Sequence, residues 1–326
     1  METTDRIYVA GHRGLAGSAI VRRLRAAGCQ NLLLRTHAEL ELTDGAGVRR
    51  FFEAERPQHV VLAAAKVGGI LANETLPADF IRENLAIQTN VIHEAWRAGV
   101  KRLLFLGSSC IYPRDCPQPM KEESLLTGPL EPTNRAYAIA KIAGIEMCWS
   151  YNRQHGAGFL AVMPTNLFGP GDNYDLQSSH VLPALMRKAH EAKQRGDDRL
   201  PVWGTGNPRR EFLYSDDMAE ACVFLLRLPQ ARYAELVSAK SLPLVNIGAG
   251  KDLSIRELAE LVCEVVGFRG KLEFDTSKPD GTPRKLLDTG RLERHPRRSA
   301  IGLRDGVRMA YDDFKATLEQ PLRAAQ

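Results

Sequence analysis

A tyrosine and a lysine spaced four residues apart are the first side chains that could do chemistry. In a helix, Tyr137 and Lys141 lie one turn apart on the same face. A nearby ammonium favours the phenolate, so it would lower the tyrosine pKa and let the hydroxyl exchange a proton near neutral pH. The YxxxK spacing occurs by chance in many helices, and it does not identify a catalytic site alone.

A serine upstream of this pair strengthens the hypothesis. Ser108 follows the apolar run 103–106, which predicts a buried strand. The carboxyl ends of parallel strands face the ligand crevice of an α/β sheet. A hydroxyl there can donate a hydrogen bond to an oxygen on which negative charge develops.

A glycine-rich turn near the N-terminus predicts a nucleotide site. Gly11, Gly14 and Gly17 follow the apolar run 7–10 and open the next helix. Glycines let the backbone approach a pyrophosphate, and the helix N-terminus supplies amide donors and a partial positive charge. The predicted cofactor-binding turn consists of Gly11, His12, Arg13, Gly14, Leu15, Ala16 and Gly17. Turn, strand-end serine and YxxxK in this order indicate a dinucleotide-dependent enzyme.

The end of the second predicted strand favours NADP over NAD. It reads Leu34-Arg35-Thr36-His37, without the carboxylate that would bind a ribose 2′-hydroxyl. Arg13 and Arg35 could instead pair with a 2′-phosphate; the alternative is that both are solvated loop residues. Because the imidazole of His37 is only partly charged at neutral pH, the strength of the preference stays open.

The elements that must position these residues alternate along the first half of the chain. We expect strands at 7–10, 32–34, 60–65 and 103–106, and helices at 15–27, from Asp44 to before Pro57, and at 77–98. In helix 77–98 the predicted buried face consists of Ile81, Leu85, Gln88, Ile92 and Ala95. Apolar strands separated by helices predict an α/β fold, a doubly wound parallel sheet of the Rossmann type.

The second half is richer in loops. Glycine and proline crowd together at 168–171, 203–208 and 278–283, while helices are expected at 215–226 and after the capping box of Ser254 and Glu257. Few strands are expected here. We therefore predict an NADP-binding domain at 1–165, to which later segments return, and a smaller, mainly substrate-binding lobe at 166–326.

Composition excludes several classes of function. The 326 residues are 44% hydrophobic and 25% charged, as in globular proteins, with a net charge of +5 and no block of basic residues. Nucleic-acid binding is therefore disfavoured, and no segment predicts a signal peptide or membrane span. Six scattered cysteines indicate a reduced, cytoplasmic protein, and the histidines form no metal-binding cluster.

Longer segments carry a resemblance to a known family. Residues 64–70, 107–113, 131–134, 163–167 and 278–285, together with the motifs above, resemble the extended short-chain dehydrogenase/reductase family from about Arg6 to the final helix. The match is closest to members that act on a GDP-linked 4-keto-6-deoxy-D-mannose. The resemblance implies a homodimeric NADPH enzyme that epimerises C3 and C5 of the sugar and reduces its C4 ketone, giving GDP-L-fucose.

The same resemblance implies roles for individual residues. Cys110 would be the base of epimerisation if its thiol pKa is depressed, and His180 the acid. Ser108 and Tyr137 would stabilise the C4 oxygen, with Tyr137 supplying the proton for reduction. The catalytic set is Ser108, Cys110, Tyr137, Lys141 and His180; the cofactor would also contact Arg35, His37, Leu106, Gly107, Ser108, Lys141, Pro164, Asn166, Leu167 and His180.

For the GDP-sugar, the resemblance points to Lys188, Trp203, Arg210 and Asp280. Without it, Lys188 reads as a solvated helix charge, Trp203 as a core residue and Cys110 as packing. The helices around 77–98 and 133–153 are expected to pair in a four-helix dimer interface. Two rival hypotheses remain: a nucleotide-sugar C4 epimerase or dehydratase that keeps NAD bound, and an inactive NADP-sensing or RNA-binding scaffold.

Overall fold

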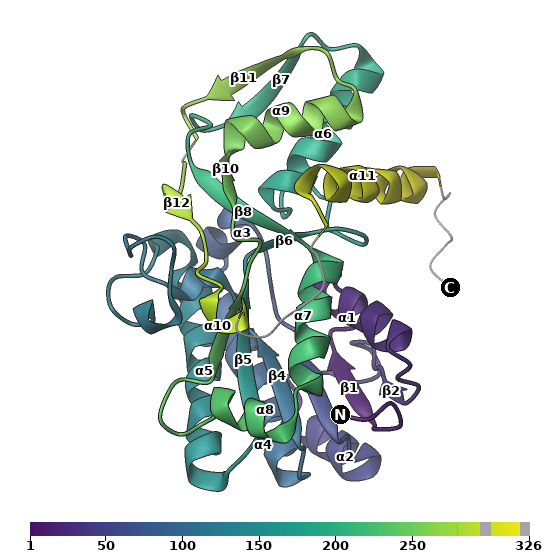
Figure 1. The fold of residues 1–326 in the computed structure, drawn as a ribbon. Helices are drawn as coiled ribbons and strands as arrows, with labels where there is room; N and C mark the ends of the chain where they lie inside the picture. The colour runs from purple at the N-terminus through teal and green to yellow at the C-terminus, as the bar shows by residue number, and fades with distance from the viewer. Residues whose placement is uncertain (279, 294–300, 320–326) are drawn as a thin grey trace.

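The apolar runs of the first half form one parallel sheet in the computed structural model, which describes residues 1–278, 280–293 and 301–319 (Figure 1). The strand order is β2-β1-β3-β4-β5-β9, and every pairing is parallel. The strands are β1 (Ile7–Ala10), β2 (Leu32–Leu33), β3 (His59–Leu62), β4 (Arg102–Leu106), β5 (Phe159–Pro164) and β9 (Leu244–Ile247). The parallel Rossmann-type sheet is confirmed; β3 ends earlier than predicted, and β5 and β9 were not predicted.

Alternate residues of each strand enter two separate cores. The helices around this sheet are α1 (Leu15–Ala26), α2 (Gly45–Glu55), α3 (Ile70–Thr75), α4 (Pro77–Arg97), α5 (Arg135–His155), α7 (Ser215–Arg227), α8 (Gln230–Leu236) and α10 (Gly290–Glu293). Tyr8 and Ala10 of β1 pack in one cluster with α2, α4 and α5, while Ile7 and Val9 pack in the other with α1 and α7. Three short 3-10 turns, Ser109–Ile111, Glu122–Ser124 and Pro132–Asn134, lie in the connections.

The predicted buried face of α4 is partly wrong. Gln88, Ile92 and Ala95 are buried, but the first turns bury Phe80 and Asn84 in place of Ile81 and Leu85. Asn84 takes its position because its side chain bonds the backbone of Lys66 in the loop after β3. A hydrophobicity pattern does not register such a polar anchor.

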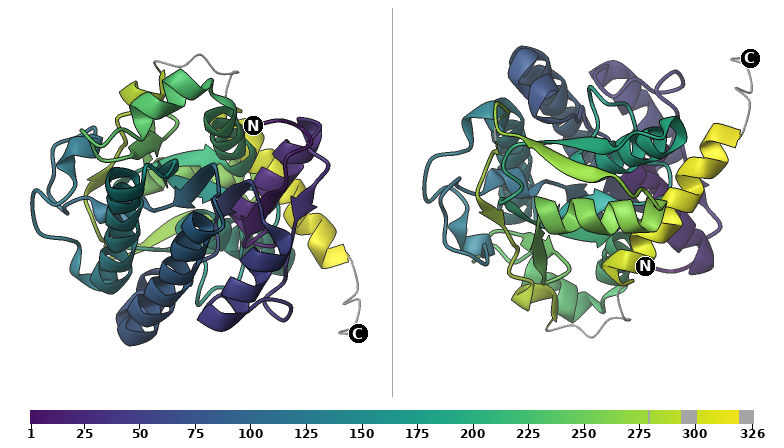
Figure 2. Two further views of the ribbon diagram at one scale, coloured as in Figure 1. Left: turned by 90° about the horizontal axis from the view of Figure 1, so that it is seen from below. Right: turned by 90° about the horizontal axis from the view of Figure 1, so that it is seen from above.

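The second lobe contains more strands than the sequence predicts. One mixed sheet contains β10 (Asp252–Ser254), β8 (Arg209–Tyr214), β12 (Arg284–Lys285) and β6 (Asn166–Phe168). A separate two-stranded parallel sheet consists of β7 (Arg199–Trp203) and β11 (Lys271–Asp275). Helices α6 (Val181–Arg195), α9 (Ile255–Val266) and α11 (Leu303–Glu319) pack on them around a third core. Figure 2 shows α9 and α11 crossing this end of the molecule. The expectation of few strands is wrong because these strands are short and carry polar residues.

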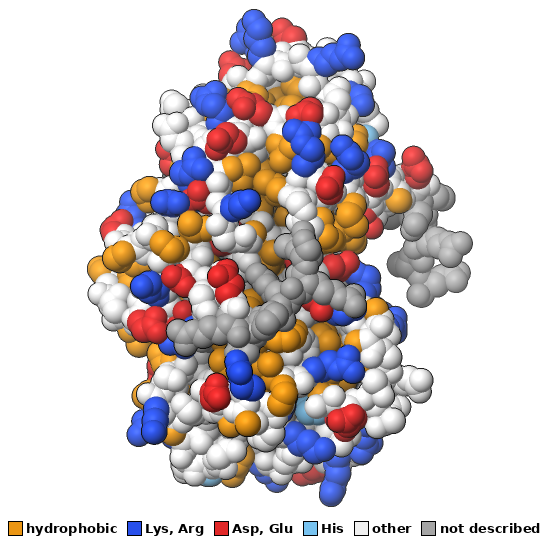
Figure 3. All heavy atoms as spheres, viewed as in Figure 1, with side chains coloured by type: hydrophobic (Ala, Val, Ile, Leu, Met, Phe, Trp, Pro, Cys, Tyr) orange, Lys and Arg blue, Asp and Glu red, His pale blue; other side chains and the backbone are white. Residues whose placement is uncertain are grey.

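Other expectations concern the surface and the cysteines. In the described parts of the chain, no helix is both long and apolar enough to cross a bilayer. All six cysteines are buried, free thiols. On the face drawn in Figure 3, Lys and Arg side chains are interspersed with Asp and Glu and form no single basic patch.

Candidate active site

A cavity of about 870 Å³ lies where β1, β3, β4 and β5 end. Its wall includes the residues that follow each of these strands, so it occupies the crevice that a doubly wound sheet offers to a ligand. Of the predicted site residues, those lining the cavity are Gly11, His12, Arg13, Gly14, Leu15, Ala16, Gly17, Arg35, His37, Leu106, Gly107, Ser108, Tyr137, Lys141, Pro164, Asn166, Leu167 and His180.

The glycine-rich turn forms a cradle that side chains would fill. A Cβ on Gly17 would lie 2.1 Å from the Gly11 carbonyl oxygen, and Gly11 itself has φ +82°. Gly14 is the N-cap of α1, and no side chain caps the helix. The amide donors of the first turn are therefore left for an external acceptor, which fits the pyrophosphate of a dinucleotide.

Two of the three basic residues expected near the 2′-phosphate already contact other side chains of the protein. Arg35 Nη2 lies 2.6 Å from Glu55 Oε1, and the guanidinium stacks on Phe51 at 5.6 Å. His37 Nε2 lies 2.5 Å from Glu41 Oε2. Arg13 is exposed at the cavity wall. Of the two arginines, Arg13 thus has the greater freedom to meet a 2′-phosphate.

Tyr137 and Lys141 lie on α5 against the end of β4. Lys141 Nζ donates to the Leu106 carbonyl at 2.9 Å and lies 5.7 Å from the centre of the Tyr137 ring. Burial raises the pKa of Tyr137 far above its usual value and lowers that of Lys141 to about 8. The expected lowering of the Tyr137 pKa is therefore wrong: desolvation and then Cys110 raise it, and only the hydrogen bond with Ser108 acts in the opposite direction. A protonated phenol is the form that can donate a proton.

Cys110 and His180 come from different lobes. Cys110 sits in the 3-10 turn after β4, only 6% exposed, and its backbone amide approaches Ser108 Oγ at 3.5 Å. His180 is the N-cap of α6. Burial raises the pKa of the Cys110 thiol, although Lys285, Ser108 and Lys141 act in the opposite direction, so the depressed thiol pKa expected of the epimerisation base is not found. Desolvation in the cleft, then Lys285, lowers the pKa of His180.

The predicted substrate residues form a second group, outside the residues that line the cavity. Trp203 is 53% exposed, so the expectation of a core residue is wrong for it. The ammonium groups of Lys188 and Lys278 lie 5.2 Å and 5.4 Å from its ring centre. This arrangement exposes an aromatic surface next to two cations, which suits a flat or anionic ligand.

The side chains of Arg210 and Asp280 both bond other groups of the protein. Burial lowers the pKa of Arg210 to about 10, and its guanidinium bonds the Arg209 carbonyl at 2.9 Å. Asp280 accepts from Thr205 N at 2.7 Å and from Thr205 Oγ1 at 2.8 Å, so its carboxylate fixes the turn after Trp203. The sequence analysis did not include Thr205, Lys278 and Lys285 among the site residues. The many charged residues of the segment 278–285 could have indicated the two lysines.

The arrangement can bind a dinucleotide beside a tyrosine proton donor and an acid–base pair. Within the described residues, no group of three His, Cys, Asp or Glu side chains could hold a metal ion. The chemistry supported by the geometry is thus proton transfer next to a carbonyl and hydride transfer to it.

Comparisons with known proteins agree with this chemistry. Residues 7–237 match the NAD dependent epimerase/dehydratase family. GDP-L-fucose synthase 1 of Arabidopsis thaliana is 60% identical, covering 95% of this chain and 93% of the relative, and the GDP-L-fucose synthase of Escherichia coli is 52% identical over 95% and 96%. A solved GDP-D-glycero-L-gluco-heptose synthase from Campylobacter jejuni, determined with NADPH, superimposes with a TM-score of 0.88 at 37% identity, covering 97% of this chain and 99% of that one.

Proposed function

The chain belongs to the NAD dependent epimerase/dehydratase family, and from this premise we propose that it converts GDP-4-keto-6-deoxy-D-mannose to GDP-L-fucose as an NADPH-dependent 3,5-epimerase and 4-reductase. The observation that carries the proposal is the meeting of Ser108, Tyr137 and Lys141 with His180 at one cavity, next to the buried Cys110. A reductase needs the first three, and inversion of a carbon needs an acid and a base from opposite sides.

In this proposal, Cys110 and His180 carry out the epimerisation. Cys110, as the base, removes a proton α to the C4 ketone, and His180 returns one to the opposite face of the same carbon. The negative charge that develops on the C4 oxygen is stabilised by hydrogen bonds from Ser108 and Tyr137. C3 and C5 both lie α to this ketone, so one pair of residues serves both carbons in turn.

The reduction uses the protonated form of Tyr137. NADPH, when bound, supplies the hydride that reaches C4. Tyr137 donates its proton to the C4 oxygen, and its raised pKa keeps that proton on the phenol until it is needed. Lys141 bonds the Leu106 carbonyl, which fixes the ammonium beside the phenol. Because Arg13 lies at the rim and no carboxylate follows β2 directly, a 2′-phosphate is favoured over a hydroxyl.

The GDP-sugar is the only partner in this proposal besides a second copy of the chain. Lys188 and Arg210 neutralise the diphosphate, Trp203 supplies a flat contact, and Asp280 shapes the turn that holds Trp203. We further propose a homodimer formed through α4 and α5, whose exposed Ile139 offers an apolar contact. The six free thiols suit the reducing cytoplasm.

The test is incubation of the protein with GDP-4-keto-6-deoxy-D-mannose and NADPH, followed by NMR of the product. We expect GDP-L-fucose and a loss of NADPH absorbance. An unchanged sugar with undiminished absorbance would overturn the proposal. Sedimentation at micromolar concentration tests the dimer, and a monomer would refute that part.

A further inference from the structure

The imidazole of His180 has no partner side chain to hold it in the site. His180 is the N-cap of α6, where its carbonyl accepts from Ala184 N at 3.1 Å. Within the described part of the chain, no hydrogen bond or ion pair reaches the ring, although the residue lines the cofactor cavity. The backbone before His180 therefore decides where the ring lies relative to the parallel sheet.

Residues 173–179, just before α6, form a compact turn. Asp175 Oδ1 accepts from Ser178 N at 3.0 Å and from Ser178 Oγ at 2.9 Å, and the Asp175 carbonyl accepts from Ser179 N at 2.8 Å. Asn173 Nδ2 also donates to Ser178 Oγ at 2.9 Å. These contacts lie within the turn, so they fix its shape and leave its position to contacts with other segments.

One backbone contact ties this turn to the first lobe. Gly69 N donates to the Ser178 carbonyl at 3.1 Å, and within the described residues no other hydrogen bond joins the 173–179 turn to residues 1–165. A Cβ on Gly69 would lie 3.1 Å from the Ser179 carbonyl oxygen and 3.6 Å from that of Ser178. With φ −67° and ψ −177°, Gly69 has an extended backbone that any residue adopts. The close approach of the turn, and not the torsion angles, therefore favours glycine here.

Two buried asparagines hold the loop that carries Gly69. Asn73, 6% exposed, donates its side-chain amide to the carbonyls of Gly68 at 2.9 Å and Gly69 at 3.0 Å. Asn84, 2% exposed, accepts from Lys66 N at 3.1 Å and donates to the Lys66 carbonyl at 3.0 Å. Lys66 also lines the cofactor cavity. The loop is therefore fixed in place between the cofactor cavity and the turn of the second lobe.

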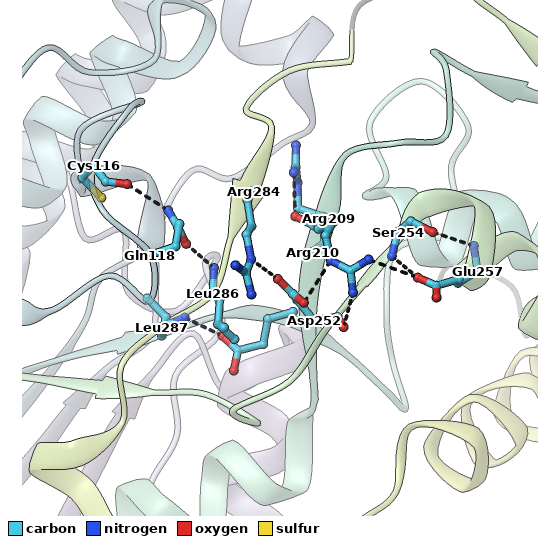
Figure 4. Close-up of polar contacts among 11 residues, drawn as sticks. Cys116, Gln118, Arg209, Arg210, Asp252, Ser254, Glu257, Arg284, Leu286 and Leu287 are labelled. Carbon is cyan, nitrogen blue, oxygen red and sulfur yellow. Dashed lines mark hydrogen bonds and ion pairs between the residues drawn. The ribbon is translucent and has the colours of Figure 1, made fainter.

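Other polar contacts between the lobes lie outside this turn. In the segment 284–288 of the second lobe, Leu286 N donates to Gln118 Oε1 at 2.9 Å (Figure 4), and the Leu286 carbonyl accepts from Met120 N at 2.7 Å. Because these contacts do not involve the 173–179 turn, loss of its single link should displace the turn without separating the lobes.

We propose that Gly69 and Asn73 are positioning residues for epimerisation: Asn73 orients the loop backbone, and Gly69 holds the turn that carries His180 against the first lobe. The inference rests on the proposed function, in which His180 is the acid that returns a proton to C3 and C5. Proton transfer needs donor and acceptor at hydrogen-bond distance, and a misplacement of about 1 Å can cost roughly 10²-fold in rate. Reduction does not depend on this contact, because the three residues of the reduction centre all belong to the first lobe.

The test compares the two half-reactions in the full chain. Gly69→Ala adds a methyl group against the Ser179 carbonyl, and Asn73→Ala removes both bonds to the loop. With GDP-4-keto-6-deoxy-D-mannose and NADP⁺, deuterium uptake from D₂O at C3 and C5 should fall by about 10–100-fold in each variant. With NADPH, NMR should show a larger share of sugar that is reduced without inversion. A merely structural loss would slow both steps and leave this share unchanged.

Asn152→Ala is the matched control for Asn73→Ala. Asn152 is 7% exposed and also makes two hydrogen bonds to backbone, donating to the Phe159 carbonyl at 2.8 Å and accepting from Phe159 N at 2.9 Å. Phe159 begins β5, whose other end meets the cavity. This variant should lose stability as Asn73→Ala does, while the share of uninverted product stays that of the wild type.

A signal that needs no turnover separates this inference from the proposed function. The NMR signal of the His180 ring proton should shift in Gly69→Ala and in Asn73→Ala and stay unchanged in Asn152→Ala. An unmoved signal in both variants, an equal shift in Asn152→Ala, or an unchanged share of uninverted product overturns the inference. If one variant loses its circular dichroism spectrum, the other decides by the same criteria. A wild type without turnover refutes the proposed function, and the His180 signal still tests the contact.

Discussion

The two lobes hold their functional groups by different physical means. In the parallel sheet, β1, β3, β4 and β5 are buried along their whole lengths, and the cofactor cavity is shaped by backbone at the strand ends. In the second lobe, β7 alternates between exposed and buried residues, and the segment 284–288 is fixed by Asp252, Glu211 and Gln118. Apolar packing positions one half of the site, and directed polar contacts position the other.

The two proposed half-reactions follow the same division. Ser108, Tyr137 and Lys141 all come from the Rossmann lobe, so the reduction centre is complete there. Epimerisation needs Cys110 from that lobe and His180 from the head of α6 in the other. The epimerase centre therefore depends on how the lobes meet, whereas the reductase centre does not. Substitutions can test this difference.

The largest expected effects separate the two centres. Cys110→Ser replaces a thiol with a much weaker acid of similar shape, and loss of a general base typically costs roughly 10²–10⁴-fold. The variant should lose deuterium uptake from D₂O at C3 and C5 while still oxidising NADPH slowly with the unepimerised ketone. His180 variants should behave alike. Exchange at the wild-type rate in Cys110→Ser would make the thiol a packing residue.

Tyr137→Phe should give the complementary result. The ring remains packed edge-on against Phe80, at 6.2 Å, but the proton for the C4 oxygen is gone. Reduction should fall by roughly 10²–10⁴-fold while measurable deuterium exchange remains. NADPH oxidation and NMR of the sugar measure the two steps separately. If the rates of reduction and of deuterium exchange fall equally, the two half-reactions share one catalytic centre, and the proposed difference between the lobes is wrong.

A backbone substitution should damage the cofactor half most. Gly17→Ala would place a Cβ against the Gly11 backbone, where neither side can give way. We expect NADPH affinity to fall by about 10–100-fold, with a lower melting temperature. Gly14→Ala is the control for the fold, because its Cβ would lie 3.6 Å from the Gly11 oxygen, an ordinary contact. Equal melting temperatures for the two variants would contradict the claim that a Cβ at position 17 clashes with the Gly11 backbone.

The cofactor half could be predicted from the sequence because its signals are local. Apolar runs predict β1 and β4, the spacing of Gly11, Gly14 and Gly17 predicts the turn, and the helix predicted from Asp44 corresponds to α2, which begins one residue later. Each of these depends on residues close together in the chain. The buried face of α4 failed where Asn84 bonds the backbone of a distant loop.

The substrate half could not be predicted in this way, because its contacts join residues far apart in sequence. Leu286 bonds Gln118 across 168 positions, and Leu287 bonds Glu211 across 76. No periodicity marks such pairs, and β12 has only two residues. The family resemblance supplied Arg210 and Asp280, but it did not show that Asp280 is occupied by Thr205.

A smaller effect tests the cofactor preference. Arg13→Ala should weaken NADPH binding by about tenfold while leaving NADH nearly unchanged, since a charge-assisted pair with the 2′-phosphate is lost. Arg22→Ala, on the helix α1 that follows the glycine-rich turn and paired with Asp216, is the matched control. Fluorescence titration with both cofactors measures the ratio. Equal losses for NADPH and NADH would mean that Arg13 only supports the loop.

The smallest expected effect concerns the polar contacts of the substrate lobe. Burial alone would raise the pKa of Asp252, but Arg284 and Arg209 lower it below the usual value overall. A lowered pKa in the folded protein contributes stability above the unfolded-state pKa of about 4, and this contribution disappears as the pH falls through the folded value. Asp252→Asn should therefore cost about 1–2 kcal/mol at pH 7 and progressively less below about pH 4.

Urea unfolding at neutral and acidic pH measures this cost, and Asp216→Asn is the control. Asp216 is 38% exposed and pairs with the 41% exposed Arg22, whereas the Asp252 side chain is 6% exposed and meets two arginines. Water screens the first pair, so its loss should cost less than about 0.5 kcal/mol. If Asp252→Asn destabilises the protein equally at both pH values, the ionic contact is not what stabilises this lobe. The stability of this lobe would then come from apolar packing around the third core, as in the parallel sheet, and the two lobes would not differ in what stabilises them.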